Sequence, residues 1–430
     1  MDNPAPLAKP KLELLQTCLY GLKSTAEISI LPLRARHPTL LGAREAENLN
    51  CRTSHATGVF IRLDHLTHNM RLLQELVGHR PLWPAIKANA YGHGAALVGR
   101  QLVRLGYHQL CVAHVAEAIA LLEARVPARF LVLSATLPAD SEDIVAYGCE
   151  PVVCTLEMVE ALAGAAARAG RRVAVHLKVD TGMGRIGIRP DEVLAFLTRC
   201  RDFPGVVVRG LMSHFPLAPA ADKSFAHQQI AIFQQVREAT RGHGITCYHL
   251  ANSAAIFDLP EAHCDAARPG IAIYGLQPSP TIVNPRVHDL KPVLEWKTRI
   301  TYLKEVPAGT GLSYGHTFYT AHPSLIATIP VGYGDGLSRR LSNNLTLLVG
   351  GTHCPQVGQI CMDQSLLDVT ALRGRVKVGD EAVIVGQQGQ ATVTVDALAE
   401  KLGTVHYEVV ASIASRVPRI AVEPSHPGVG

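Results

Sequence analysis

The chain has 430 residues, of which 47% are hydrophobic and 18% charged, so it can bury a large core, and its length favours two domains. Its formal net charge of +5 is mild and comes without a dense basic run, which argues against nucleic-acid binding, and no apolar run reaches the roughly 20 residues that cross a bilayer. The ten cysteines contain no CxxC pair, which predicts reduced thiols, a cytoplasmic location and no metal site.

Residues 1–57 form the least informative segment. The stretch 12–22 is compatible with one amphipathic helix, but Glu13 and Gln16 interrupt the apolar run that a signal peptide needs, and the acidic residues disfavour a transit peptide. We expect a poorly ordered N-terminal extension.

A strand followed by a helix begins at Gly58. GVFIRL is a short apolar strand, and Asp64 is placed to cap the helix behind it. The residues at helical spacing are Leu66, Met70, Leu73 and Val77. This first unit opens a longer series of the same kind.

Eight further strand-like runs follow, most of them separated by helical periodicity. The strands lie at 82–88, 110–114, 130–135, 151–154, 173–180, 206–215, 247–251 and 266–275, and the clearest helices at 96–105, 115–124, 156–169 and 223–240. Apolar strands without clean alternation are typical of a parallel sheet covered on both faces, and eight is the number that closes a (β/α)8 TIM barrel. We predict such a barrel over residues 58–283, although an open doubly wound sheet remains possible. The strand at Gly58 would be a ninth strand, which an eight-stranded barrel cannot include, so it is expected to join the other domain.

The pattern of predicted elements changes after Val283. Short β-rich segments such as VLEWKTRITYLKEV, LTLLVGG and EAVIVG are separated by Gly and Pro, with one late helical stretch at 395–401. Residues 284–430 are therefore predicted to form a mainly β domain.

Lys87 stands where an apolar barrel strand ends. A lone lysine at a strand end usually extends to water. Burial, however, lowers the pKa of a lysine and gives a neutral amine that can form a Schiff base with a carbonyl cofactor. The residues Asn89, Tyr91 and His93 follow among glycines, which is more typical of a site wall.

The loops after the last two barrel strands have the composition of a phosphate site. Backbone N–H groups and small residues let an anion approach there. They carry Asn252 and Ser253 in the first loop and Arg268, Gly270 and Ile271 in the second. A lysine opposite such a cradle suggests pyridoxal phosphate.

The combined motifs resemble the bacterial alanine racemases, a family of pyridoxal-phosphate-dependent isomerases. They are AIKANAYGHG, LKVDTGMGRIG, SHF, NSAA, ARPGIAIYG, GTGLSYGHTF, VGYGDG, QICMDQ and HYEV…SRVPR, in this order over residues 58–420. The resemblance implies the interconversion of L- and D-alanine by two bases, a homodimer with shared active sites, and a supply of D-alanine for peptidoglycan.

The resemblance also assigns roles to residues. Lys87 would hold the cofactor and act as one base, and Tyr314 of the partner subunit would act as the other. Arg268 would face the pyridine nitrogen, His214 would lie beside the ring, and Arg185 would contact the phenolic oxygen and the substrate. The phosphate and its surroundings would be bound by Tyr91, Asn252, Ser253, Gly270, Ile271 and Tyr407. Met362 and Asp363 of the second subunit would narrow the entrance around the substrate carboxylate, and Lys178 matches a lysine that is carbamylated in many members.

Single motifs of this sequence also occur in proteins of other function. GMGRIG (182–187) satisfies G-x-G-x-x-G after a strand, but a dinucleotide fingerprint requires the helix to begin within the glycines, and here it is expected at Pro190. A barrel-type decarboxylase usually prefers an acidic partner for the pyridine nitrogen, and a cofactor carrier of the same barrel type lacks a counterpart of Tyr314. A racemase of serine, lysine or a broader range of amino acids stays open.

Overall fold

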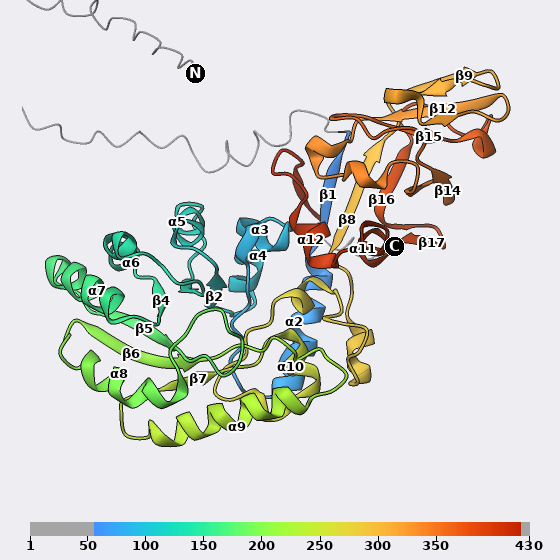
Figure 1. Ribbon diagram of the computed structural model, residues 1–430. Coiled ribbons are helices and arrows are strands. Elements are labelled where there is room, and N and C mark those ends of the chain that lie inside the picture. Colours follow the sequence, from blue (N-terminus) through green and yellow to red (C-terminus); the bar gives the residue numbers. More distant parts are fainter. Residues whose placement is uncertain (1–55, 423–430) are drawn as a thin grey trace, which may run out of the picture. The chain divides into compact units, whose positions relative to one another are not determined.

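The protein is described by a computed structural model that covers residues 56–422 (Figure 1). The predicted extension at 1–57, with its helix at 12–22, lies outside the described residues except for its last two positions. None of the helices in residues 56–422 combines the length and apolarity needed to span a membrane.

A parallel sheet forms the N-terminal part of the described chain. Its strands run in the order β2 (Gln109–Val112), β3 (Arg129–Val132), β4 (Glu150–Val153), β5 (Val173–Lys178), β6 (Val206–Met212) and β7 (Cys247–His249). Isolated bridges extend it at both edges, because Ala85 pairs with Cys111 and Ala266 pairs with His249. A third bridge, between Leu82 and Ala267, joins these two added segments and closes the ring.

Two of the eight predicted strands are shorter than expected. Segment 82–88 pairs only around Leu82 and Ala85, and segment 266–275 leaves the sheet after Ala267 and continues as a 3₁₀ turn over Ile271–Tyr274. Pro84 and Pro269 explain the interruption, since proline has no N–H to donate to a neighbouring strand. The predictions of continuous strands over these two ranges were therefore wrong, whereas the α/β barrel class is confirmed.

Helices follow the strands and, in Figure 1, lie along the outside of the sheet. They are α4 (Ala95–Arg104), α5 (Val115–Glu123), α6 (Ser141–Tyr147), α7 (Leu156–Ala169), α8 (Val193–Cys200), α9 (Ser224–Ala239) and α10 (Ser253–Asp258). Helix α2 (Leu63–Val77) precedes them, and it begins two residues too early for Asp64 to cap it. The carboxylate of Asp64 instead pairs with Arg62 at 2.7 Å, so the predicted cap was wrong.

The C-terminal part is mainly β, as predicted. A seven-stranded sheet has the order β14 (Thr352–Pro355), β13 (Thr346–Val349), β16 (Glu381–Gln388), β8 (Leu294–Arg299), β1 (Gly58–Arg62) and β18 (Arg419–Val422), and β17 (Ala391–Val393) pairs with β16. Smaller sheets are formed by β9 (Tyr302–Val306), β12 (Ser324–Ile329) and β15 (Ser365–Asp368), and by β10 (Gly311–Leu312) with β11 (Phe318–Tyr319). Helix α11 (Val395–Leu402) matches the predicted late helix, and α12 (His406–Ala411) was not predicted. Strand β1, from the start of the described chain, lies between β8 and β18.

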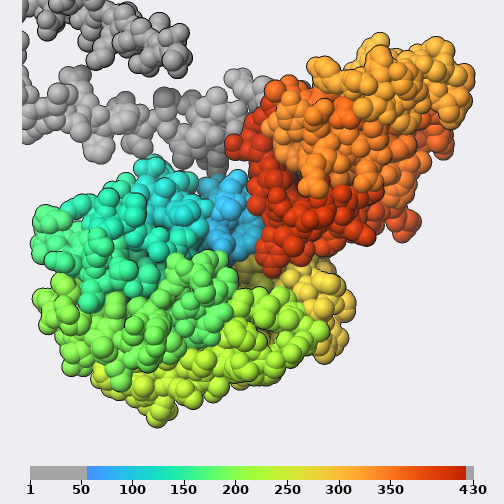
Figure 2. All heavy atoms as spheres, in the orientation of Figure 1, coloured from blue at the N-terminus to red at the C-terminus, as the bar shows by residue number. Residues whose placement is uncertain are grey.

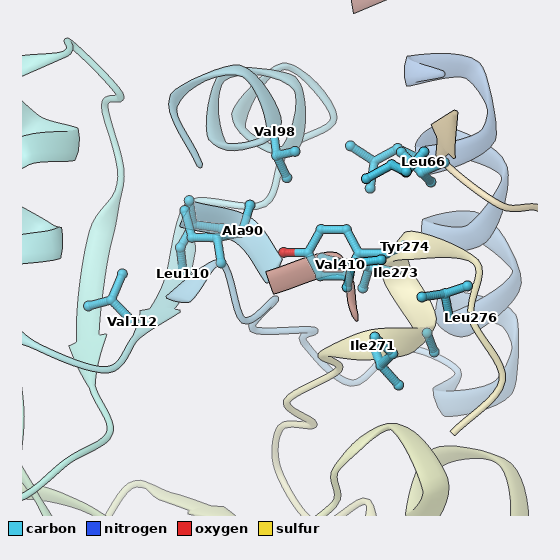
Figure 3. Packing of buried hydrophobic residues seen from close by; sticks show 14 of the residues in the cluster. Leu66, Ala90, Val98, Leu110, Val112, Ile271, Ile273, Tyr274, Leu276 and Val410 are labelled. Atoms are coloured by element: carbon cyan, nitrogen blue, oxygen red, sulfur yellow. The ribbon is translucent and has the colours of Figure 1, made fainter. Parts of the chain in front are cut away.

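The two parts share a continuous hydrophobic core near α3 (Lys87–Tyr91). Tyr274 is fully buried there and donates a hydrogen bond to the carbonyl oxygen of Ala85 at 2.9 Å. Figure 3 shows its ring among Ala90, Ile273 and Val410, with the hydroxyl directed toward the side of α3. In Figure 2 the blue surface of the first helices adjoins the red surface of the C-terminal residues. This packing fixes the lysine-bearing segment against α12.

Candidate functional site

Lys87 opens a turn of left-handed backbone. It follows the bridge at Ala85 and starts α3, in which Ala88 to Tyr91 have φ between 50° and 54°. The prediction that Lys87 ends a strand is therefore corrected, because the strand has already ended. Left-handed conformations are unfavourable for residues other than glycine, so this turn needs external support. Glu117 provides it, since one carboxylate oxygen accepts the Ala88 N–H at 2.6 Å and the other accepts the Ala113 N–H at 2.7 Å.

The surroundings of Lys87 favour its neutral form. Burial lowers the pKa of the amine, and the positive charge of Arg185 lowers it further. The carboxylate of Glu117 acts in the opposite direction without reversing the shift. A neutral amine is the nucleophilic form, so the lysine is suited to attack a carbonyl group.

Cations gather around His214. Burial keeps the pKa of His214 well below its ordinary value, and the charges of Arg268, Lys178, Arg185 and Lys87 lower it further. The structure thus brings together five residues that the sequence singled out in four separate segments. An accumulation of cations around a neutral imidazole fits a ligand with several negative charges.

Arg268 is buried and held by three acceptors. Its Nη1 lies 2.6 Å from His249 Nδ1, and its Nη2 donates to the carbonyl oxygens of Ser213 at 2.8 Å and Leu250 at 3.1 Å. Burial lowers the pKa of the guanidinium to about 10, so it stays charged at neutral pH. A fixed cation on the barrel wall can therefore present its remaining N–H groups to a ligand.

Lys178 is the most enclosed amine of this cluster. Its side chain is 2% exposed, and its Nζ has no hydrogen-bond partner within residues 56–422. Burial, reinforced by the charge of Arg268, keeps the pKa of this amine well below its ordinary value. A buried amine without a partner is unfavourable unless it reacts or gains an anionic neighbour.

A polar cradle lies at the start of α10. The Ser253 hydroxyl oxygen accepts the N–H of Gly270 at 2.8 Å and of Ala272 at 3.3 Å, so its own proton is free to point elsewhere. A Cβ on Gly270 would lie 2.6 Å from the hydroxyl oxygen of Tyr91, so the missing side chain lets that phenol approach. The Tyr91 ring lies 6.2 Å from that of Tyr407. Burial raises the pKa of both phenols, that of Tyr407 to about 12, so both stay donors.

The remaining residues of the predicted cradle have structural roles in the same place. The Asn252 side chain accepts the Ala255 N–H at 3.1 Å and caps α10, and Ile271 is buried at the start of the turn that follows Gly270. Serine and phenol donors around a glycine suit a phosphate group, and this cradle shares the barrel end with Lys87 and Arg268. The residues present therefore fit pyridoxal phosphate.

Tyr314 lies on a turn of the C-terminal part and is 71% exposed. Its neighbours Ser313 and Gly315 have φ of 62° and 70°, and the Ser313 hydroxyl anchors the turn by donating to the Gln359 carbonyl at 2.6 Å. A hollow of about 530 Å³ is lined by Ser313, Tyr314, Cys361, Met362, Asp363 and Gln364. The structure thus brings Tyr314, Met362 and Asp363 together, but Lys87 is not part of this lining.

The Asp363 loop of this hollow is connected to two other quoted motifs. Arg416 of SRVPR pairs with Asp335 of VGYGDG at 2.7 Å and with Asp363 of CMDQ at 2.8 Å. A Cβ on Gly332 would lie 2.2 Å from the Cys361 carbonyl oxygen and 2.5 Å from the Met362 carbonyl oxygen. Glycine is therefore required for the close approach of these loops.

The glycine-rich segment after β5 does not form a dinucleotide site. One carboxylate oxygen of Asp180 accepts the N–H groups of Gly182, Met183 and Gly184 at 2.8 to 3.1 Å. These amides are thus already satisfied by the chain itself. The next helical turn begins at Pro190, as expected, and leads into α8.

Sequence reasoning missed several polar residues that support the site. Glu117 occupies the third position of α5, where a glutamate usually caps its own helix. Its presence there is explained by capping alone, so the sequence did not indicate its second contact, with the N–H of Ala88. His176 and His249 lie in β5 and β7 and face the barrel interior, and His176 stands two residues before Lys178. Because alternate strand residues share a face, that spacing was the available signal.

Family and structure comparisons agree with this geometry. Residues 61–278 match the model of the alanine racemase N-terminal domain, and residues 293–421 match that of the C-terminal domain. An alanine racemase of Halothermothrix orenii is 42% identical over 86% of this chain and 98% of its own, and alanine racemase 2 of Caldanaerobacter subterraneus is 43% identical over 85% and 95%.

Solved structures give the same result. The alanine racemase of Clostridium difficile 630 has a TM-score of 0.82 at 32% identity, covering 86% of this chain and 97% of that one. That of Bacillus anthracis with bound L-Ala-P has a TM-score of 0.81 at 31% identity, covering 86% and 96%. The chain therefore belongs to the alanine racemase family.

Proposed function

We propose that the protein is an alanine racemase that interconverts L- and D-alanine with pyridoxal phosphate and two proton-transferring residues. The single observation that carries this proposal is the cluster of Lys87, Arg185, His214 and Arg268 beside the cradle of Ser253 and Gly270. When bound, pyridoxal phosphate supplies a carbonyl that takes up the amino group and a ring that draws electron density from Cα.

The chain supplies the binding groups for this chemistry. Lys87, with its lowered pKa, would hold the cofactor and then move a proton on one face of the substrate Cα. Arg268 would donate toward the ring nitrogen without giving up its proton, Arg185 would contact the phenolic oxygen, and His214 would pack beside the ring. The phosphate would be bound by Tyr91, Ser253, Gly270, Ile271 and Tyr407, with Asn252 holding the loop.

We also propose a homodimer with shared sites. Tyr314 is highly exposed and lies in a hollow that Lys87 does not line, so the second base would come from the partner subunit. Met362 and Asp363 would accompany it and narrow the substrate entrance, with Arg185 near the substrate carboxylate. The expected place in metabolism is the supply of D-alanine for peptidoglycan in the cytoplasm.

Proton NMR in heavy water tests this function. Purified, cofactor-loaded protein is incubated with L-alanine, and the Cα proton signal is followed while a chiral reagent measures the D-isomer. We expect loss of the Cα proton together with D-alanine formation in the wild type and in a Tyr302→Phe control, and neither in Tyr314→Phe. Formation of the decarboxylated amine, or no change of alanine, would refute the proposal.

Two further assays define its range. The same measurement with serine and lysine separates an alanine racemase from one of broader specificity. Rescue of a bacterial strain that requires D-alanine, by expression of the wild type but not of Lys87→Ala, tests the link to the cell wall.

A further inference from the structure

A chain of polar side chains crosses the interior of the barrel behind Arg268. Arg268 Nη1 lies 2.6 Å from His249 Nδ1, and His249 Nε2 lies 2.8 Å from His176 Nδ1. His176 Nε2 then lies 3.1 Å from Glu150 Oε2, and Glu150 Oε1 accepts from Arg209 Nη1 at 2.7 Å. Five charged or polar groups from four strands and one bridged segment are thus joined end to end.

This chain replaces the apolar side chains that usually fill a barrel interior. Both histidines are fully buried, and Glu150 is 6% exposed. Trp83 contacts both imidazoles edge-on, with ring centroids 5.7 Å from His176 and 4.9 Å from His249. A Cβ on Gly210 would lie 2.3 Å from His176 Nδ1, so the sequence leaves space for this ring. Buried polar groups of this kind are unfavourable unless each finds its partner.

The hydrogen bonds can run in only one direction. A guanidinium has donors and no acceptor, so His249 Nδ1 must accept, and a neutral His249 then carries its proton on Nε2. That proton is donated to His176 Nδ1, which leaves the His176 proton on Nε2, facing Glu150. An ionised carboxylate has acceptors and no donor, so the far end of the chain requires the same order.

We propose that Glu150 is a positioning residue for Arg268, acting through His176 and His249, which it holds as neutral Nε2–H tautomers. The Glu150 carboxylate can only accept a hydrogen bond, so it prevents His176, and through it His249, from changing to the tautomer that carries the proton on Nδ1. Nδ1 of His249 therefore always faces Arg268 as an acceptor. With Ser213 and Leu250 occupying Nη2, the guanidinium is held by three acceptors. The directions of its Nε–H and second Nη1–H groups are then fixed as well. The last step rests on the proposed function, because only there does Arg268 meet the pyridine ring.

The tautomers are tested on the wild-type apoprotein, without any assay of activity. Two-bond ¹H–¹⁵N correlation spectra of ¹⁵N-histidine-labelled protein distinguish Nε2–H, Nδ1–H and imidazolium rings, and His176→Gln and His249→Gln assign the two signals. Both rings are expected as Nε2–H near neutral pH. An Nδ1–H or doubly protonated form of either ring would overturn the proposal, whether or not the protein proves to be a racemase.

The effect on Arg268 is read from its guanidinium signals. Restricted rotation should give separate Nη resonances in the wild type, and Glu150→Ala, which removes the acceptor, should merge them. Arg209→Gln, which leaves the Glu150 carboxylate and its bond to His176 intact, should keep the Nη resonances separate. Unchanged Arg268 signals in a folded Glu150→Ala protein would contradict the proposal.

A double-mutant cycle connects the chain to the cofactor site. Glu150→Ala should raise the dissociation constant of pyridoxal phosphate about tenfold, as expected for loss of a hydrogen bond to a charged group. In an Arg268→Gln background the same change should alter the constant by less than about twofold, because Glu150 then has nothing to position. A full tenfold effect in both backgrounds would assign Glu150 a purely structural role.

Discussion

A Cβ atom on Gly92 would lie 1.9 Å from the carbonyl oxygen of Val410, so the turn that follows Lys87 and the helix α12 are in contact through bare backbone. Gly92 also has φ of 80°, and its carbonyl accepts a hydrogen bond from Arg419 at 2.9 Å. The lysine turn is therefore fixed by the C-terminal part of the chain as well as by the barrel.

Gly92→Ala should consequently destabilise the protein by about 3 kcal/mol or more, because both the backbone angle and the contact oppose a methyl group. Gly78→Ala is a matched control, since Gly78 has φ of 68° but no atom of residues 56–422 beyond its chain neighbours lies within 4 Å of the place its methyl group would take, and it should lose only about 1 kcal/mol. Denaturant unfolding of both variants measures the difference. Equal losses would show that backbone strain alone decides the outcome.

Replacement of Arg185 by an uncharged residue should raise the pKa of Lys87. Burial and the charge of Arg185 lower the pKa of Lys87, so removing that charge in Arg185→Gln raises the pKa toward its ordinary value. The neutral amine is then populated only at higher pH. The rate of covalent capture of pyridoxal phosphate, followed by absorbance against pH, should show its midpoint shifted upward. The control Arg189→Gln, which removes a solvated arginine paired with Asp191, should leave the midpoint in place.

Lys178 is expected to carry a carbamate. The lowered pKa of its buried amine favours the neutral form, which would attack the carbon of CO₂, forming an N–C bond while one amine proton leaves to solvent, and the resulting anion would lie among Arg185 and Arg268. With ¹³C-bicarbonate, ¹³C NMR should show a carbamate signal that is absent in Lys178→Ala. The absence of this signal from the wild type, or its persistence in the variant, would rule the modification out.

Two inactive variants should restore activity to each other. If each site combines Lys87 of one subunit with Tyr314 of the other, a mixed dimer of Lys87→Ala and Tyr314→Phe chains has one intact site and one doubly defective site. After random re-association of equal amounts, activity should reach about one quarter of the wild-type value. Continued inactivity of a mixture shown to contain hybrid dimers would mean that both bases come from one chain.

Arg416 should influence substrate binding more than folding. It joins Asp335 to Asp363 at the hollow of Tyr314, so Arg416→Gln frees the Asp363 loop. We expect a several-fold higher KM for alanine with a melting temperature close to that of the wild type. Arg373→Gln breaks a comparable exposed pair with Glu305 and should change neither quantity. A lower melting temperature without a change of KM would contradict this assignment.

The succession of strands and helices was predictable because long periodic segments carry it. The helix at 156–169 was located to the residue, since Thr155 caps it and Gly170 ends it in a left-handed conformation. The left-handed turn at Ala88 to Tyr91 was not predictable, because of its four residues only Asn89 readily adopts that conformation. It depends on Glu117, 29 residues further along the chain from Ala88.

The cofactor-facing residues were found through motifs, whereas the groups behind them were not. Ser253 and Gly270 occur in recognisable loops, and the structure brings them within 2.8 Å. Glu150 lies in a plain apolar strand, and its link to Arg268 passes through two histidines of other strands. These hydrogen bonds join side chains from strands that become neighbours only when the barrel closes. No pattern within a single strand predicts them.

The position of β1 affects how the chain folds during synthesis. Val59 in β1 pairs with Trp296 and with Arg419, so one sheet takes its neighbouring strands from the two ends of the described sequence. The C-terminal sheet is therefore incomplete until β18 leaves the ribosome, and β1 stays unpaired while the whole barrel is made. A fragment that starts after the barrel would expose the unpaired edges of β8 and β18 and should aggregate.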